Sequence, residues 1–178
     1  MKHVALLRGI NVGGKNKLAM KDLASLFTAA GCRDVTTYIQ SGNVIFNAHA
    51  PLLKKLAPAI SIAILDRFGL RVPIVIRSHE QLAAAAGTNP YLAEGIDPKC
   101  LHLMFLATHP APAAVATLDP DRSPPSRFHV HGQDIYLHFP QGVAQNKITN
   151  AWIDAKLSTV STIRNWSTVL KLIELTRG

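Results

Sequence analysis

The sequence predicts an α+β fold made of two halves in which strands and helices follow one another in a similar order. Short β-prone runs alternate with segments whose apolar residues recur at helical spacing. A stretch rich in turn-forming residues, between Gly87 and Lys99, divides the chain. The 178 residues are enough for one domain or for two small ones.

The first half begins with an expected strand at residues 3–8, followed by a glycine-rich loop and a helix. Apolar residues at helical spacing mark the helix over 20–30, and a glycine ends it. Two β-rich runs, 35–39 and 44–46, flank residues 40–43, whose Gly and Asn suit a tight turn. We therefore expect an antiparallel hairpin after the first helix.

A second helix is expected over residues 52–68, with Pro58 either kinking it or starting its main body. A fourth strand follows at 72–76. Residues 78–81, Ser-His-Glu-Gln, match a capping box, in which Ser and Gln each bond the other's backbone amide. This motif predicts a helix through the alanine-rich run 82–85.

The second half repeats much of this order. We expect a strand, a short helix, two strands and a helix, at residues 100–106, 112–118, 128–130, 135–139 and 148–157. A polar turn at 162–165 then precedes a final amphipathic helix over 166–173. We therefore predict a duplicated α/β plait: two ferredoxin-like halves of βαββαβ type, residues 1–88 and 99–178, with added helices.

Positive charge is concentrated in the first half. The net charge is +8, and residues 1–89 hold eleven Lys and Arg against four Asp and Glu. An anionic partner and a plain basic surface both explain this asymmetry. We expect a soluble cytoplasmic protein with no membrane partner, because the apolar runs are short, no export signal is visible, and Cys32 and Cys100 are isolated.

The most unusual local sequence is the glycine-rich loop of residues 8–17. Gly9, Gly14 and Lys15 satisfy the first part of a Walker A loop. Asn16 stands where a Ser or Thr would bind Mg²⁺, and the helix begins late, so we do not expect a nucleotide hydrolase. The loop suits an anion-binding nest of backbone amides and cations, and a simple tight turn explains the glycines equally well.

Topology places three loops at one end of the first sheet. They are the glycine-rich loop, the turn at 40–43 and the turn at 67–71, and right-handed crossovers bring them together. The cations expected at this end are Arg8, Lys15, Lys17, Arg67 and Arg71. The candidate ligand-binding residues are Arg8, Asn11, Gly13, Gly14, Lys15, Lys17, Gln40, Ser41 and Asn43.

The second half adds three ligand-binding candidates, Lys147, Arg164 and Asn165. Asn146 and Asn165 also suit helix capping, with Trp166 buried as an anchor, and we favour that interpretation. No catalytic constellation is evident, since the chain shows no nucleophile elbow, Cys-His signature or clustered set of metal ligands. We therefore expect no metal and no cofactor, assign no catalytic residue, and leave open whether the protein is an enzyme.

Four segments resemble a bacterial family called domain of unknown function 1697. They lie at residues 6–14, 38–44, 147–151 and 164–172, and read LLRGINVGG, YIQSGNV, KITNA and RNWSTVLKL. The resemblance covers nearly the whole chain and implies a pair of ferredoxin-like subdomains, with no established activity. The sequence departs from the family pattern at 144–146, where Ala-Gln-Asn replaces Gly-Arg-Ser, and at Ile163, where Thr is usual. Loss of that arginine weakens a second anion site.

Three kinds of function fit these observations. The leading hypothesis is a binding module for a phosphate-bearing ligand, a nucleotide or a nucleic acid backbone, at the basic end of the first sheet. Backbone contact is favoured, because the first and third strands offer no aromatic residue beyond Phe46 for stacking bases. One alternative is a small-molecule enzyme with a cleft between the halves. The other is a homodimeric interaction protein that buries apolar sheet faces.

Overall fold

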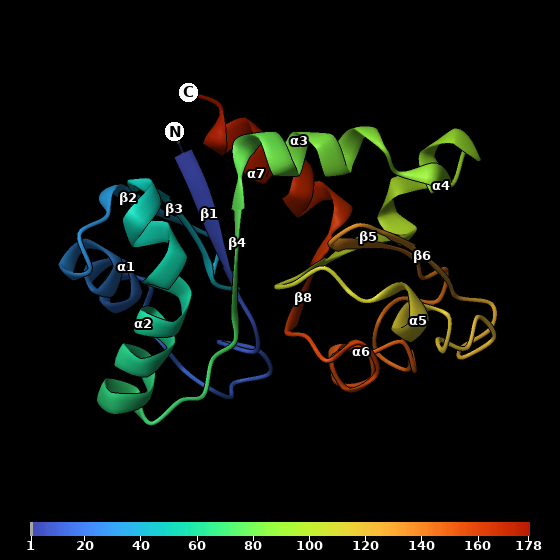
Figure 1. The fold of residues 1–178 in the computed structure, drawn as a ribbon, viewed down its shortest axis with the longest axis horizontal. Coiled ribbons are helices and arrows are strands. Elements are labelled where there is room, and N and C mark those ends of the chain that lie inside the picture. Colours follow the sequence, from blue (N-terminus) through green and yellow to red (C-terminus); the bar gives the residue numbers. More distant parts are fainter. Residues whose placement is uncertain (1) are drawn as a thin grey trace. The chain divides into compact units, whose positions relative to one another are not determined.

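The computed structural model describes residues 2–178, and contacts divide the chain into two units (Figure 1). The first unit consists of the residues up to Leu82 together with Leu172–Gly178, and the second of Ala83–Lys171. Each unit contains a four-stranded sheet with helices packed on it. The α+β class and the two similar halves that the sequence predicts are confirmed.

The first unit has the order expected of a ferredoxin-like fold. Its elements are β1 (Lys2–Leu7), α1 (Met20–Ala29), β2 (Arg33–Tyr38), β3 (Asn43–Asn47), α2 (Ala50–Phe68) and β4 (Ile74–Ser78). All strand pairs are antiparallel, in the order β2-β3-β1-β4. Phe27 of α1 and Ile60 of α2 pack with Phe46 of β3 in one apolar core, so the helices cover one face of the sheet.

Residues from the end of the chain complete the first unit. The ammonium group of Lys2 donates to the backbone carbonyls of Leu175 (3.4 Å) and Arg177 (3.1 Å). His79 Nδ1 lies 3.1 Å from Thr176 Oγ1. These bonds join residues 175–177 to β1 and to the beginning of α3 (His79–Gly87).

Helix α2 decides between the two positions that the sequence leaves open for Pro58. It begins at Ala50, and its N-cap His49 accepts a hydrogen bond from the Leu52 amide at 3.2 Å. Pro58 therefore lies inside the helix and does not start it. Gly69, at φ 68°, ends the helix in the left-handed conformation.

The second unit repeats the strand order of the first. Its elements are α4 (Pro90–Ala93), the 3-10 helix η1 (Pro98–Cys100), β5 (Leu101–Leu106), α5 (Pro112–Val115), β6 (Arg127–His131), β7 (Asp134–His138), α6 (Asn150–Leu157) and β8 (Ser161–Asn165). The strands pair antiparallel in the order β6-β7-β5-β8. Helices α3 (His79–Gly87) and α7 (Trp166–Thr176) each contain a boundary between the units. Among residues 2–178, no helix is long and apolar enough to cross a bilayer.

Two segments of the second half were predicted wrongly. Residues 162–165, predicted as a polar turn, belong to β8, which pairs with β5 so that Arg164 lies opposite Leu103. The linker expected between Gly87 and Lys99 contains α4 and η1. Asn89 and Asp97 cap these short helices, because a capping side chain followed by Pro starts a helical turn as readily as a loop.

Helices α3 and α7 follow β4 and β8 with no residue between them. At the first junction the predicted capping box is present: the Gln81 amide donates to Ser78 Oγ at 3.2 Å, and the Ser78 amide to Gln81 Oε1 at 2.9 Å. At the second, Asn165 Oδ1 accepts from the Thr168 amide at 2.9 Å, and Trp166 is 3% exposed. Asn165 therefore caps α7 as expected.

Candidate functional site

The glycine-rich loop forms a small hairpin at the end of β1. The Lys15 amide donates to the Val12 carbonyl at 3.0 Å, and these two residues form an isolated β-bridge. Between them, Gly13 and Gly14 have φ of 58° and 75°, as in the type I′ turn of a two-residue hairpin. Helix α1 begins only at Met20, so the loop does not lead into a helix N-terminus as a Walker A loop does.

Asn11 fixes this hairpin to the rest of the unit. Its Nδ2 donates to the carbonyls of Leu18 (2.8 Å) and Gln40 (3.0 Å), and its Oδ1 accepts from the Leu18 amide (2.9 Å). Both hydrogens of the side-chain amide are therefore used within the protein. The observed contacts of Asn11, a predicted ligand-binding residue, join the glycine-rich loop to the turn between β2 and β3.

Backbone bonds confirm that three loops meet at the end of β1. The Leu7 amide donates to the Gly42 carbonyl at 2.8 Å, and the Arg8 amide to the Pro73 carbonyl at 3.0 Å. We name this region, residues 8–17, 38–43 and 69–73, the hairpin end. Most of the predicted ligand-binding residues lie here, and the Arg8 side chain is half-buried.

A buried side chain holds the turn between β2 and β3 by hydrogen bonds. Asn43 is fully buried, and its Nδ2 donates to the Tyr38 carbonyl (3.1 Å) and to Ser41 Oγ (3.2 Å). Gln40 is exposed, and its carbonyl accepts the bond from Asn11. Asn43 thus holds the turn from within, and Gln40 presents its side chain to solvent.

The cations of the hairpin end differ in their surroundings. Lys15, Lys17 and Arg71 are exposed. Neither lysine forms an ion pair with any part of the chain that the structure describes. Arg67, which lies in the last turn of α2 and outside the hairpin end, is 4.0 Å from a carboxylate oxygen of Asp22. Arg71 forms no ion pair within residues 2–178 either, so these two lysines and Arg71 carry the charge that is available to a ligand.

Backbone strain is concentrated at the hairpin end. Three of the five non-glycine residues with positive φ among residues 2–178 lie here, namely Asn11, Asn16 and Ile39. Ile39, at φ 49°, is β-branched and 48% exposed, although branched side chains rarely adopt this conformation. Strain of this kind gathers at functional sites, where surrounding contacts maintain it.

The second-half candidates occupy different settings. Arg164 is 8% exposed, and its Nη1 donates to Thr162 Oγ1 (2.9 Å) and to the Ile163 carbonyl (2.7 Å). Burial lowers the pKa of Arg164 to about 10. Asn165 caps α7, and Lys147 is exposed at a cavity. Arg164 is thus part of a buried network, Asn165 is a helix cap, and Lys147 is part of a cavity wall.

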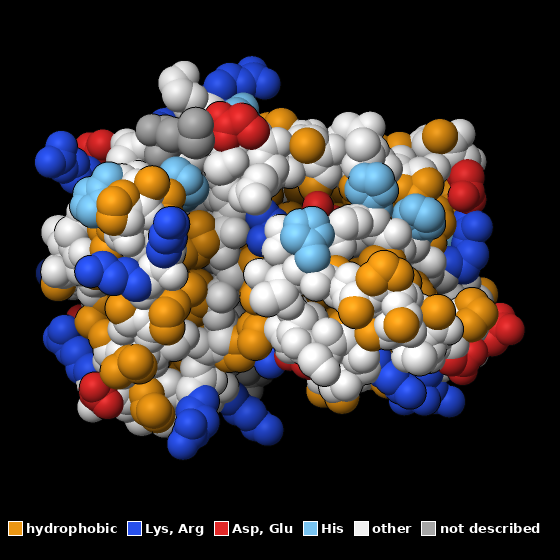
Figure 2. Space-filling model, in the orientation of Figure 1, with side chains coloured by type: hydrophobic (Ala, Val, Ile, Leu, Met, Phe, Trp, Pro, Cys, Tyr) orange, Lys and Arg blue, Asp and Glu red, His pale blue; other side chains and the backbone are white. Residues whose placement is uncertain are grey.

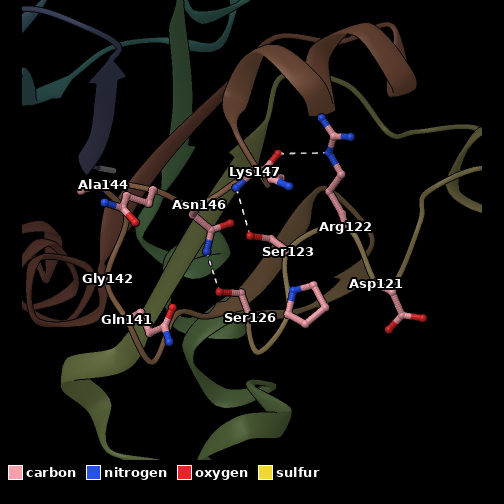
Figure 3. A pocket seen from close by; sticks show the side chains of 11 residues that line it. Asp121, Arg122, Ser123, Ser126, Gln141, Gly142, Ala144, Asn146 and Lys147 are labelled. Atoms are coloured by element: carbon pink, nitrogen blue, oxygen red, sulfur yellow. Dashed lines mark hydrogen bonds between the residues drawn. The ribbon is translucent and has the colours of Figure 1, made fainter.

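That cavity has a volume of about 610 Å³ and lies in the second unit (Figure 3). The loop before β6 and the loop after β7 form its walls. Arg122, Ser123 and Ser126 come from the first loop, and Lys147 from the second. The sequence alone does not point to the first loop, whose only local signal is the polar, proline-rich run of residues 119–126.

Hydrogen bonds join the two walls. Asn146 Nδ2 donates to Ser126 Oγ at 2.6 Å, and the Lys147 amide donates to Ser123 Oγ at 3.1 Å (Figure 3). The capping interpretation of Asn146 is wrong, because Thr149 is the N-cap of α6. Asn146 instead fixes the loop ahead of that helix.

Metal binding is not supported by the arrangement of the side chains described. His129 and His131, two residues apart on β6, are exposed. Among residues 2–178, no three His, Cys, Asp or Glu side chains are grouped so that they could hold a metal ion. The groups that both regions offer are ammonium, guanidinium, hydroxyl and amide donors. Such groups bind and orient oxyanions.

Comparison with known proteins supports the fold and leaves the activity open. No curated protein matches the chain. A solved structure of a conserved bacterial protein from Streptococcus pneumoniae is similar over 99% of this chain and 98% of that one, with a TM-score of 0.70 and 22% sequence identity. The model of a family described as a protein of unknown function, DUF1697, matches residues 1–136. The chain therefore belongs to the DUF1697 family.

Proposed function

We propose that the protein binds a phosphate-bearing polymer, the backbone of a nucleic acid, at the hairpin end. The observation that carries this proposal is the pair of exposed lysines, Lys15 and Lys17, without carboxylate partners among residues 2–178. Lys15 belongs to the hairpin and Lys17 follows it, and Asn11 fixes the hairpin by three hydrogen bonds. Ordering the hairpin in advance reduces the entropy that binding would otherwise lose.

The exposure of the hairpin favours an extended ligand over an enclosed small molecule. Gly13 and Gly14 are exposed, and a Cβ atom added to either would meet nothing within 4 Å. A phosphate backbone can therefore approach the turn closely. The excess of eleven Lys and Arg over four Asp and Glu in residues 1–89 supplies a wider attractive field. Figure 2 shows several Lys and Arg side chains on the surface over α1 and α2.

The chemistry favours contact with the backbone rather than with bases. Phe46, the aromatic residue of the first and third strands, is fully buried against Phe27, so it offers no surface on which a base could stack. Affinity that depends on phosphate contacts falls as salt rises, because each neutralised phosphate releases counterions. The proposal therefore predicts weak sequence preference and a strong dependence on salt.

Fluorescence anisotropy with a labelled single-stranded oligonucleotide tests the proposal. The dissociation constant is measured over a series of salt concentrations. Each lost phosphate contact reduces the slope of log affinity against log salt by about 0.7, so the Lys15→Gln/Lys17→Gln double variant should show a slope shallower by about 1.4. Absence of binding by the unmodified protein at low salt would refute the proposal.

A matched control separates a site from general positive charge. Lys54 and Lys55 are exposed on α2, and the Lys54→Gln/Lys55→Gln double variant removes the same charge away from the hairpin. We expect it to retain most of the slope. Equal losses in the two double variants would show that the hairpin is not the site.

A further inference from the structure

We propose that the cavity of the second unit binds a small polar molecule that carries a phosphate group. This site is separate from the hairpin end and does not depend on it. Its volume of about 610 Å³ lies within the range of about 300–1,000 Å³ that is typical of small-molecule sites. Hydroxyl, amide and charged side chains line much of it, which favours a hydrophilic ligand.

Two cations from different loops carry the recognition of the phosphate. Arg122 and Lys147 both line the cavity, and Arg122 Nε donates to the Lys147 carbonyl at 3.4 Å. Asp121 is the one carboxylate of the lining, and Figure 3 shows it pointing away from Asn146 and Lys147. Both cations are exposed, so the positive charge of the cavity lies on the side that is open to solvent.

The guanidinium of Arg122 is held in place before a ligand binds. Its Cζ lies 5.4 Å from the centre of the Trp152 ring, in a cation–π contact. With Nε bonded to a carbonyl, its two terminal nitrogens make no hydrogen bond within residues 2–178. A planar pair of N–H donors suits two oxygens of one phosphate.

The serine hydroxyls add donors at fixed positions. Ser123 Oγ and Ser126 Oγ each accept one hydrogen bond, from the Lys147 amide and from Asn146 Nδ2. Neither hydroxyl donates a bond to another part of residues 2–178, so each hydrogen can point to a ligand oxygen. Ser126 is 6% exposed, which places its donor at the closed end of the cavity.

The facing loop offers a contact for the rest of the ligand. Gln141 lines the cavity, and its side-chain amide makes no hydrogen bond within the described chain. An amide both donates and accepts, which matches the hydroxyl groups of a sugar or polyol. The structure therefore assigns a sugar phosphate or a polyol phosphate as the class of ligand.

Amide chemical shifts of the full-length protein, measured by NMR during titration, test this assignment. The probes are ribose 5-phosphate and glycerol 3-phosphate, with ribose, glycerol and inorganic phosphate as comparisons. We expect millimolar or tighter binding of the phosphorylated probes, with shifts at residues 122–126 and 141–147. Shifts confined to other residues, or absent with both phosphorylated probes, would overturn the proposal. Equal binding of ribose, or equal binding of inorganic phosphate, would overturn the ligand class.

Variants distinguish this site from the hairpin end. Arg122→Gln and Lys147→Gln should each weaken binding about tenfold, because each removes a charge-assisted hydrogen bond. Lys147→Gln retains the backbone bonds of the loop, so it remains informative if Arg122→Gln unfolds. Lys156→Gln, on the exposed side of α6, is the matched control and should not change the affinity. Loss of binding in Lys15→Gln/Lys17→Gln, with no loss in the cavity variants, would assign the phosphate to the hairpin end instead.

Discussion

Gly42 is the residue on which the geometry of the hairpin end depends most closely. It has φ of 80°, and a Cβ atom built on it would lie 2.8 Å from Leu7 Cβ and 2.9 Å from Ile10 Cδ1. Gly42→Ala should therefore lower the free energy of unfolding by about 2–4 kcal/mol, which combines backbone strain with overpacking. Urea denaturation measures the change. Gly13→Ala is the control, because it has a similar φ and no neighbour within 4 Å, and it should cost about 1–2 kcal/mol. Equal costs would refute the steric argument.

The two cysteines should differ in reactivity. Cys32 is buried, and desolvation raises the pKa of its thiol to about 11, so about one molecule in a thousand carries the reactive thiolate at pH 8. Cys100 is half-exposed. We expect one rapidly reacting thiol when the folded protein is treated with a disulfide reagent, and none after Cys100→Ser. A fast phase that survives Cys100→Ser would contradict the burial of Cys32.

Among the elements, α2 contains an internal defect. Pro58 lies inside a helix that extends from Ala50 to Phe68, where a proline removes one backbone hydrogen bond and crowds the preceding turn. The side chain is exposed. Pro58→Ala should raise the free energy of unfolding by about 2 kcal/mol, the helix gain less the added flexibility of the unfolded chain. Thermal denaturation monitored by circular dichroism measures this change in stability. A lower melting temperature for Pro58→Ala would show that the proline stabilises the helix.

Elements with strong apolar periodicity or a clear capping motif could be predicted from the sequence, whereas β8 could not. Leu52, Leu56, Ile60 and Ile64 of α2 are all buried, as their spacing predicts. β8 has no such pattern. Ile163 is its single large apolar residue, and its pairing with β5 depends on backbone bonds between residues far apart in the chain. A strand of this kind cannot be distinguished from a polar turn by local sequence.

The two candidate sites illustrate the same limit. The Gly-Gly pair of the hairpin is a strong local signal for a tight turn. The strand order expected from the sequence was enough to predict that three loops meet. The bonds of Asn11 to the other loop, by contrast, depend on the folded backbone. Arg122 and Lys147 lie 25 residues apart in the chain, and only the packing of two irregular loops makes them neighbours.

At the scale of the whole molecule, the stability of the fold should depend on pH through two half-buried histidines. Burial lowers the pKa of His102 and of His138 below the ordinary value of 6.5, and the positive charge of Arg127 adds to the shift of His138. The unfolded chain then binds more protons than the folded protein as pH falls below about 6.5. The free energy of unfolding should therefore fall between neutral and mildly acid pH, and level off below the lowered pKa values.

Thermal denaturation across this pH range measures the effect. His102→Gln should flatten the dependence, because it removes one group that protonates on unfolding. His131→Gln, which changes an exposed histidine, should leave the curve unchanged. If the free energy of unfolding of the unmodified protein stays constant from neutral to mildly acid pH, the two half-buried histidines bind protons as readily in the folded protein as in the unfolded chain, and the prediction is wrong.

The discontinuous first unit has a consequence for biosynthesis. Ala83–Lys171 is a single continuous stretch, whereas the first unit also needs Leu172–Gly178, whose carbonyls receive the bonds from Lys2. During translation, every residue of the second unit leaves the ribosome before the last residues of the first. The usual order, in which the N-terminal domain matures first, therefore does not hold here. Strand β1 is made before the other strands of residues 2–178, and it is among the last of them to acquire all its partners.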